Sequence, residues 1–165
     1  MHKHRLFFAL WPEAAERDAM AAAARRLFPL SGRPVAAPDL HVTLAFVGGI
    51  DAERVGRFLE LERALPAIPL SFDVLEHWGK PRVLVAAARQ TPAALQRAVD
   101  DLWQRLDRLG VARETRPLRP HVTLARDVGQ FRGAPWPPVC WHARSIRLIE
   151  SRPDADPRYA PVRTD

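Results

Sequence analysis

The sequence is poor in cysteine and lacks a long apolar segment. Cys140 is the only cysteine among 165 residues, so the chain can form no internal disulfide. This count fits a reducing compartment, and we expect a cytoplasmic protein. No run of apolar residues approaches the length that a membrane span requires, so we expect no membrane partner. The apolar part of residues 1–6 is too short for a secretory signal peptide.

Acidic residues are also in the minority. The 19 aspartates and glutamates face 25 lysines and arginines, which gives a net charge of +6 and a pI near 10.8. Such a balance favours an anionic partner, for example a nucleic acid or a nucleotide. An arginine-rich composition can also be the habit of a whole genome, so the charge alone identifies no partner. The length fits one compact domain or two intimate lobes.

Histidine is scarce as well, but two of the six histidines lie in identical surroundings. The string HVTLA occupies residues 41–45 and returns at residues 121–125. Alternating valine, threonine and leucine predict a strand in each case. Since side chains at i and i+2 share one face of a strand, each copy presents a histidine and a threonine together.

The repeat suggests an internal duplication, with the two His-x-Thr faces looking at each other across a cleft. Such a site holds two groups that can give or take a proton near neutral pH, with two hydroxyls between them. That arrangement suits a phosphoryl group. A single His-x-Thr would more often be an ordinary strand with a polar face, and it is the exact repetition that favours a functional site.

The remaining pattern predicts an α+β protein with antiparallel or mixed sheets and helices on their outer faces. We expect helices over residues 12–28, 51–65 and 91–110, the last capped by Thr91. We expect strands at residues 5–11, 41–47, 68–75, 82–88, 121–125, 145–150 and 159–162. Residues 127–138 are rich in glycine and proline and predict a loop. No stretch resembles a linker, so residues 1–165 are expected to form a single bilobal domain.

The other histidines and the tryptophans carry less information. His2, His4, His77 and His142 show no partner pattern and are expected to be surface or structural residues. Trp103 lies on the apolar stripe of the third helix and is expected in the core. The sequence does not separate a core role from a cleft-lining role for Trp11, Trp136 and Trp141.

These segments together resemble the bacterial and archaeal RNA 2′,3′-cyclic phosphodiesterases, also called 2′-5′ RNA ligases, of the two-histidine phosphoesterase superfamily. The resemblance runs nearly end to end. It is carried by RLFFAL at 5–10, GRPVAAPDLHVTLAFVG at 32–48, PRVLVAA at 81–87, RPHVTLARD at 119–127, and Ser151 with Arg158-Tyr159. Residues 152–157 depart from it, because they are rich in proline and aspartate where the family commonly has glycine.

The resemblance implies a bilobal fold of two sheets related by a pseudo-two-fold axis around a central cleft. It implies metal-free hydrolysis of RNA 2′,3′-cyclic phosphate ends to 2′-phosphates, with weak reversible 2′-5′ joining of RNA ends. In this family His41 would be the proton donor and His121 the proton acceptor, while Thr43, Thr123 and Arg126 would bind the phosphate. The implied protein is a monomer without a cofactor that acts on such RNA ends or on cyclic nucleotides.

The chemistry of the residues agrees with that assignment, with one difficulty. Displacement at phosphorus needs a base on one side and an acid on the other, which two facing histidines supply. No carboxylate–histidine cluster has metal-ligand spacing, so we expect no metal site. By strand alternation, however, Arg126 lies opposite to His121 and Thr123. It reaches the phosphate only if the strand ends or twists near Ala125, and otherwise it is a surface arginine paired with Asp127.

Two other functions remain open at this point. One is a different two-histidine phosphoesterase, acting on 2′-5′ oligonucleotides or on a nucleotide-derived cyclic phosphate. The other is a non-catalytic RNA-binding protein, which is less attractive because binding alone gives no reason for two histidines in matched settings.

Overall fold

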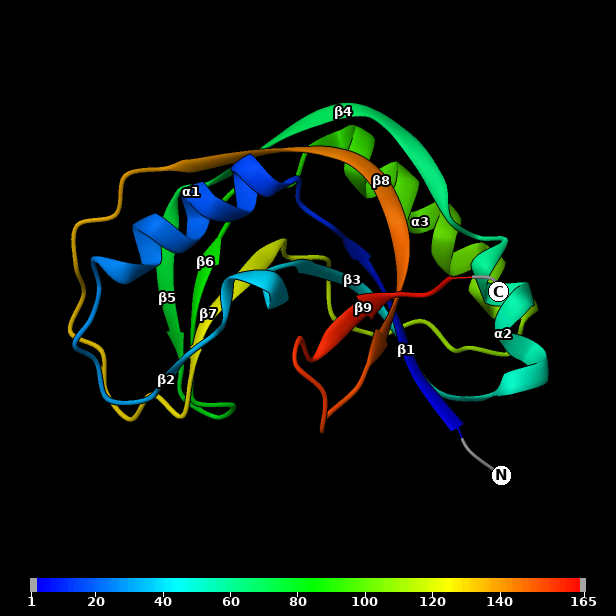
Figure 1. Cartoon of the computed structure of the whole chain (residues 1–165). Helices are drawn as coiled ribbons and strands as arrows, with labels where there is room; N and C mark the ends of the chain where they lie inside the picture. The colour runs from blue at the N-terminus through cyan, green and yellow to red at the C-terminus, as the bar shows by residue number, and fades with distance from the viewer. Residues whose placement is uncertain (1–2, 164–165) are drawn as a thin grey trace.

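Two antiparallel sheets dominate the computed structural model, which describes residues 3–163 (Figure 1). Sheet A has the order β3-β1-β8-β4, with β9 paired to β8, and sheet B has the order β2-β7-β6-β5. The strands are β1 (Lys3–Leu10), β2 (Arg33–Pro34), β3 (Val42–Asp51), β4 (Arg63–Phe72), β5 (Val74–Trp78), β6 (Val83–Ala87), β7 (His121–Arg126), β8 (Val139–Ser151) and β9 (Tyr159–Pro161). All their pairings are antiparallel. The predicted α+β class is thereby confirmed. Of the two expected kinds of sheet, antiparallel and mixed, the structure has the antiparallel kind.

Three α-helices complete the described part of the chain: α1 (Ala14–Arg25), α2 (Val55–Leu59) and α3 (Ala93–Arg108). Glu13 and Glu16 form a capping box at the start of α1, which satisfies backbone N–H groups that have no partner inside the helix. In α3 the apolar stripe is buried, and Trp103 is only 5% exposed, as expected. No helix within residues 3–163 has the length and apolar character of a membrane span.

The segment after Asp51 differs most from the sequence expectation. The expected helix over residues 51–65 is a 3-10 turn, Ala52–Arg54, followed by the short α2, and β4 begins at Arg63. The cause is pairing with β8, which buries Ile68, Leu70 and Phe72 and outweighs the local helix propensity. The same pairing makes β8 begin at Val139, six residues before the predicted start.

Two further boundaries were wrong. The strand predicted over residues 68–75 is interrupted at Asp73, so its two parts belong to different sheets. Asp73 accepts a hydrogen bond from the backbone N–H of Arg89 (3.0 Å), which holds the chain where it passes between the sheets. Helix α3 begins at Ala93 with Pro92 as its N-cap, in place of the expected Thr91.

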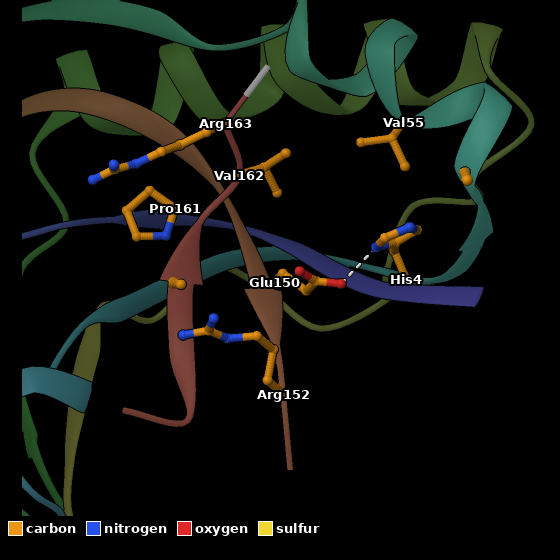
Figure 2. Close-up of a pocket in the computed structure, with 9 residues that line it drawn as sticks. His4, Val55, Glu150, Arg152, Pro161, Val162 and Arg163 are labelled. Atoms are coloured by element: carbon orange, nitrogen blue, oxygen red, sulfur yellow. Dashed lines mark hydrogen bonds and ion pairs between the residues drawn. The ribbon is translucent and has the colours of Figure 1, made fainter. Parts of the chain in front are cut away.

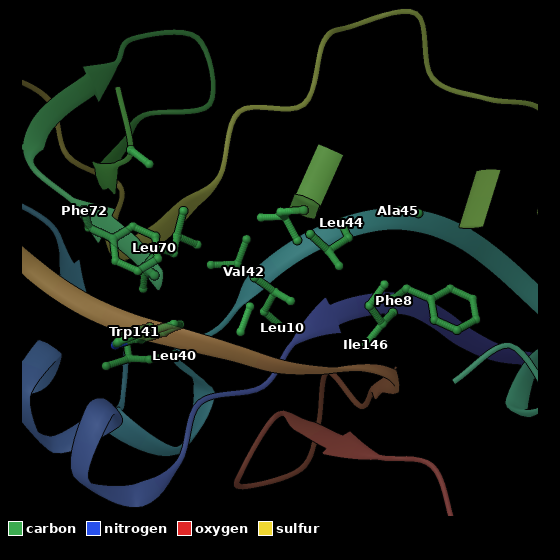
Figure 3. Packing of buried hydrophobic residues seen from close by; sticks show 14 of the residues in the cluster. Phe8, Leu10, Leu40, Val42, Leu44, Ala45, Leu70, Phe72, Trp141 and Ile146 are labelled. Carbon is green, nitrogen blue, oxygen red and sulfur yellow. The ribbon is translucent and has the colours of Figure 1, made fainter. Parts of the chain in front are cut away.

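One continuous hydrophobic core connects the sheets. It contains Phe8 and Val42 from sheet A together with Leu84 and Val122 from sheet B, all fully buried. Figure 3 shows the packing around Phe8, Val42 and Leu70. Strand β3, which directly follows His41, and strand β7, which begins with His121, lie against each other where the sheets meet (Figure 1). The two HVTLA motifs are therefore neighbours in space.

Both histidine strands carry a β-bulge at the same place in the motif. In β3, Thr43 pairs with Ala9 and Ala45 with Phe8, so Leu44 is an extra residue. In β7, Thr123 pairs with Val85 and Ala125 with Leu84, so Leu124 is the extra residue. An extra residue reverses the alternation of side chains beyond it. The residue that follows each motif, Phe46 or Arg126, therefore lies on the same face as the histidine and the threonine.

Gly32 allows β2 to lie close to the end of β7, and we use it to test this packing. A Cβ at Gly32 would lie 2.6 Å from the carbonyl oxygen of Arg126, and the residue has φ +116°. Gly110 also has a positive φ, +84°, but open space around it. Gly32→Ala should therefore lower the free energy of unfolding by at least about 1 kcal/mol more than Gly110→Ala, measured by denaturant titration. Equal losses would contradict the close approach.

Candidate active site

The imidazole rings of His41 and His121 are held in the same way. Nδ1 of His41 lies 2.7 Å from the carbonyl oxygen of Asp39, and Nδ1 of His121 lies 2.7 Å from that of Arg119. A carbonyl oxygen can only accept, so in each ring Nδ1 carries the hydrogen. In each ring this leaves Nε2 as the nitrogen available for proton transfer.

The rings of both histidines lie against apolar side chains from their own sheet. The sheet A floor consists of Phe7, Ala9 and Ile149, with Trp11 and Tyr159 packed against them. The sheet B floor consists of Val83, Val85 and Ala87, with Val74 and Trp78 packed against them. Each floor shields its histidine from water on one side.

Aromatic rings make several of these contacts. The ring of His41 lies 4.8 Å from that of Tyr159, 5.1 Å from Phe7 and 6.0 Å from Trp11. The ring of His121 lies 4.5 Å from that of Trp78. The sequence pattern did not identify Phe7, Trp78 and Tyr159 as site residues. The alternation in residues 5–11 could have identified Phe7, because it places Phe7 and Trp11 on one strand face.

Asp39 fixes two of these groups at once. Its carbonyl oxygen accepts from His41, and its carboxylate Oδ1 accepts a hydrogen bond from the backbone N–H of Tyr159 at 3.0 Å. Tyr159 follows Asp39 by 120 positions in the chain. This residue therefore ties the C-terminal strand β9 to the start of the first motif.

The five predicted site residues come together at the junction of the sheets. His41 Nε2 lies 3.1 Å from Thr43 Oγ1, and Thr123 shares a strand face with His121. The charges of Arg126 and His121 both act on His41. Nη2 of Arg126 donates to the hydroxyl of Tyr159 at 3.4 Å, and the Tyr159 ring lies on His41. One chain thus supplies two imidazoles, two hydroxyls and a guanidinium to one place.

The position of Arg126 resolves the difficulty that strand alternation raised. The expectation that Arg126 faces away from His121 and Thr123 was wrong, because the bulge at Leu124 reverses the alternation. The hydrogen bond to Asp127 comes instead from Nε of Arg33, at 2.6 Å. Arg33 pairs with Arg126 across β2 and β7, so the ion pair of Arg33 and Asp127 lies next to Arg126.

Partial burial sets the protonation state of both histidines. Removal from water lowers the pKa of His41 to about 4, helped by the charges of Arg126 and His121 and opposed by the hydrogen bond to Asp39. Burial also lowers the pKa of His121, against the hydrogen bond to Arg119. Both rings are therefore mostly neutral at pH 7 in the free protein.

The shift at His41 also ties stability to pH. The unfolded chain takes up a proton near pH 6.5, whereas the folded chain resists it until about pH 4. Since the unfolded state binds more protons in that window, this group makes the protein less stable as the pH falls from 6.5 towards 4. Above pH 6.5 the ring is neutral in both the folded and the unfolded state, so this loss of stability is absent.

The remaining histidines have structural partners. His77 Nε2 donates to the carbonyl oxygen of Val128 (2.8 Å), and His142 Nδ1 lies 3.8 Å from a carboxylate oxygen of Glu16. His4 contacts Glu150 at 2.6 Å. His2 lies outside the described residues. In the described range 3–163, no group of three or more histidine, cysteine, aspartate or glutamate side chains is placed to hold a metal ion.

A cavity of about 600 Å³ lies elsewhere on sheet A. Figure 2 shows it beside His4, Glu150 and Arg152. Glu150 pairs with Leu6, whose side chain points away from the face that carries Phe7. None of the five predicted site residues lines this cavity. We assign the active site to the two histidines and not to this cavity, although the cavity is large. Proton transfer requires titratable groups that lie close together.

Comparisons with known proteins identify the family of the chain. The family model described as LigT like Phosphoesterase matches residues 10–85. The RNA 2',3'-cyclic phosphodiesterase of Escherichia coli (strain K12) is 34% identical over 140 residues, which is 83% of this chain and 80% of that protein. The enzyme of the same name from Thermus thermophilus is 29% identical over 167 residues, 89% of this chain and 81% of that one.

Solved structures give the same picture for the fold. A crystal structure of a phosphoesterase superposes with a TM-score of 0.85 at 32% identity, covering 98% of this chain and 97% of the other. Escherichia coli LigT complexed with 3'-AMP superposes with a TM-score of 0.82 at 31% identity, again covering 98% and 97%.

The pKa of His41 can be measured directly. A proton NMR titration, with the signal assigned by its loss in His41→Asn, should give a midpoint near pH 4 in the free protein. Inorganic phosphate should raise that midpoint, because an anion beside Arg126 favours the charged imidazole. A midpoint near 6.5 in the free protein would refute the effect of burial. An unchanged midpoint with saturating phosphate would show that the anion does not bind here.

Proposed function

Because the chain belongs to the family of LigT-like phosphoesterases, we propose that it hydrolyses RNA 2′,3′-cyclic phosphate ends to 2′-phosphates. The observation that carries the proposal is the convergence of His41, His121 and Arg126 at one junction of the sheets. The name shared by the Escherichia coli and Thermus thermophilus relatives supports the same substrate class.

In this mechanism the two histidines act on opposite sides of phosphorus. His121 takes a proton from the attacking water through Nε2. His41 gives a proton to the 3′-oxygen as its bond to phosphorus breaks, so the 2′-phosphate remains. The attacking and leaving oxygens must lie roughly in line, which places the phosphate between the two rings. Each proton transfer by a positioned histidine contributes about 10²–10⁴ in rate.

The phosphate charge falls to Arg126 and the two threonines. Because the bulge in β7 turns Arg126 towards the histidines, its guanidinium can contact an equatorial oxygen of the phosphate. Thr43 and Thr123 present hydroxyls from opposite sheets, and Thr43 would exchange its contact with His41 for one with phosphate. Donors that are held in place before the substrate arrives stabilise developing charge without a metal ion.

The half-buried position of His41 fits the role of proton donor. A pKa near 4 makes the protonated ring a strong acid, but it also leaves the ring neutral at pH 7. A bound phosphate anion offsets the charge of Arg126 and raises the pKa, so substrate binding would load the proton. The acid must be charged and the base neutral together, and the rate should therefore pass through a maximum with pH.

Four subsidiary proposals accompany this mechanism. Weak 2′-5′ joining of RNA ends would be the same displacement with an RNA 5′-hydroxyl in place of water: the 5′-oxygen forms a bond to phosphorus as the bond to the 3′-oxygen breaks. Residues 1–165 would act as one bilobal domain and as a monomer, since one chain supplies both motifs. The single cysteine, Cys140, is free, which is consistent with a cytoplasmic protein.

Substitution of the two histidines tests the mechanism. With EDTA present, His41→Ala and His121→Ala should each lower kcat for cytidine 2′,3′-cyclic phosphate by about 10²-fold or more. A nitrophenyl phosphodiester, whose leaving group needs no proton, should restore much of the rate to His41→Ala and little to His121→Ala.

The exposed His142 on β8 supplies the matched control. His142→Ala should keep the wild-type rate, and circular dichroism should show all three variants folded. Near wild-type turnover by either motif variant would refute the acid–base pair. Rescue of His121→Ala alone would exchange the donor and acceptor roles.

A further inference from the structure

Glu76 places a carboxylate on the face of sheet B that carries His121. It pairs with Val85 of β6, which pairs in turn with Thr123 of β7, so the three side chains share one face. Trp78, two residues further along β5, lies on the same face. A negative charge here opposes the binding of phosphate. The partners of Glu76 show what it contributes instead.

Both carboxylate oxygens of Glu76 hold groups that flank His121. Oε2 accepts a hydrogen bond from the indole Nε1 of Trp78 at 2.9 Å, and Oε1 accepts one from Nη2 of Arg119. The Trp78 ring lies 4.5 Å from the His121 ring. The backbone carbonyl oxygen of Arg119 accepts the Nδ1 hydrogen of His121 at 2.7 Å. We call Glu76, Trp78 and Arg119 the Glu76 clamp.

The register of sheet B explains why Trp78 needs to be held. His121 pairs with Ala87, and Ala87 pairs with Val74, so Val74 occupies the same row as His121. Trp78 lies four residues further along β5, a distance of about 13 Å in an extended strand. Its indole must therefore lean back along the strand to reach His121. The hydrogen bond to Glu76, which lies between Val74 and Trp78, holds the indole in that direction.

The tryptophan beside His41 has a cation where the tryptophan beside His121 has an anion. The guanidinium carbon of Arg17 lies 5.1 Å from the centre of the Trp11 ring, and the Trp11 ring stacks on that of His41. A nearby negative charge favours the protonated form of an imidazole, and a nearby positive charge opposes it. Because the two HVTLA motifs are identical, such differences in their surroundings must distinguish the two histidines.

Four charged or titratable groups face His121 in the described part of the chain. Arg119 precedes it, Arg126 shares its strand face, and His41 lies across the junction of the sheets. Glu76 comes from β5, while the side chains of β6 on this face are apolar. Burial has the largest effect on the pKa of His121 and lowers it. Of the neighbouring charges, Arg119 also lowers this pKa, and Glu76 raises it.

We propose that Glu76 is a positioning residue for the proton acceptor His121. Its carboxylate holds Trp78 against the imidazole and holds Arg119, whose backbone accepts from Nδ1, so that Nε2 is directed at the attacking water. Its negative charge also offsets the positive charge of Arg119 and makes His121 a stronger base. This inference rests on the proposed function and adds to it a residue that touches neither the substrate nor the reacting atoms.

The first experiment neutralises each charge of the clamp in turn. A proton NMR titration, with the His121 signal assigned by its loss in His121→Asn, should give a lower midpoint than wild type in Glu76→Gln. Arg119→Gln should give a higher midpoint, because it removes the positive charge and keeps the backbone carbonyl. Asp101→Asn is the matched control, because Asp101 on α3 also pairs with two arginines but lies outside the site. It should leave the midpoint unchanged.

Kinetics test the positioning separately from the charge. Glu76→Gln can still accept from Trp78, so it should lower kcat for cytidine 2′,3′-cyclic phosphate only roughly 3- to 10-fold. Glu76→Ala releases the indole as well and should lower kcat by about 10²-fold. KM should not rise in either variant, since the loss of a negative charge does not weaken the binding of phosphate. Asp101→Asn should keep the wild-type kcat and KM.

Three outcomes would overturn the inference. They are an unchanged His121 midpoint in both glutamine variants, shifts of the two midpoints in the same direction, and a wild-type kcat in Glu76→Ala. If Glu76→Ala is unfolded by circular dichroism, the isosteric Glu76→Gln decides. If the wild-type protein hydrolyses no cyclic phosphate, the proposed function fails. The NMR titration then still shows whether Glu76 acts on His121, because it requires no turnover.

Discussion

The extra residue in each histidine strand determines which side chains share a face with the histidines. With regular pairing, Phe46 and Arg126 would point into the core, where a guanidinium without partners would be costly. With Leu44 and Leu124 bulged, both side chains face the junction of the sheets, while the leucines themselves remain buried. The candidate site depends on this shift of one residue. The shift brings the cation of Arg126 and the aromatic ring of Phe46 to the face of the two histidines.

The apolar floors under the two histidines give the site its proton chemistry. Burial against Phe7, Trp11 and Tyr159 lowers the pKa of His41 and keeps the ring neutral until an anion arrives. The hydrogen bonds from Nδ1 to the carbonyl oxygens of Asp39 and Arg119 fix the ring orientation and the tautomer. Because the acceptors are neutral, these bonds add no charge to the site. The same burial makes the folded state less tolerant of acid, so this part of the protein gives up some stability for its chemistry.

The sequence alone predicted the parts of this structure that rest on local pattern. The HVTLA strings indicated two strands with histidine and threonine on one face, and the stripe of α3 placed Trp103 in the core. What it could not predict depends on partners distant in the chain. A bulge exists only relative to the paired strand, so the side of Arg126 was wrong. Residues 63–65 begin strand β4 and do not end a helix, because Arg63 and Ala64 pair with β8.

Tyr159 shows the same limit within the site. It reaches His41 because β9 pairs with β8 and because its backbone N–H donates to Asp39. No sequence motif predicts either contact. The resemblance to a known family supplied roles for five residues, and the fold brings those five together. It did not supply the aromatic surroundings that set the histidine pKa values.

The proposed mechanism requires that the bond from phosphorus to the 3′-oxygen breaks, and one measurement tests this directly. Phosphorus NMR of cytidine 2′,3′-cyclic phosphate after incubation with the protein in EDTA identifies the isomer that forms. If His41 protonates the 3′-oxygen while His121 activates water, the product is the 2′-phosphate alone, and a His41→Ala, His121→Ala double variant forms none. A 3′-phosphate product, or a 2′-phosphate formed equally fast by the double variant, would contradict the account.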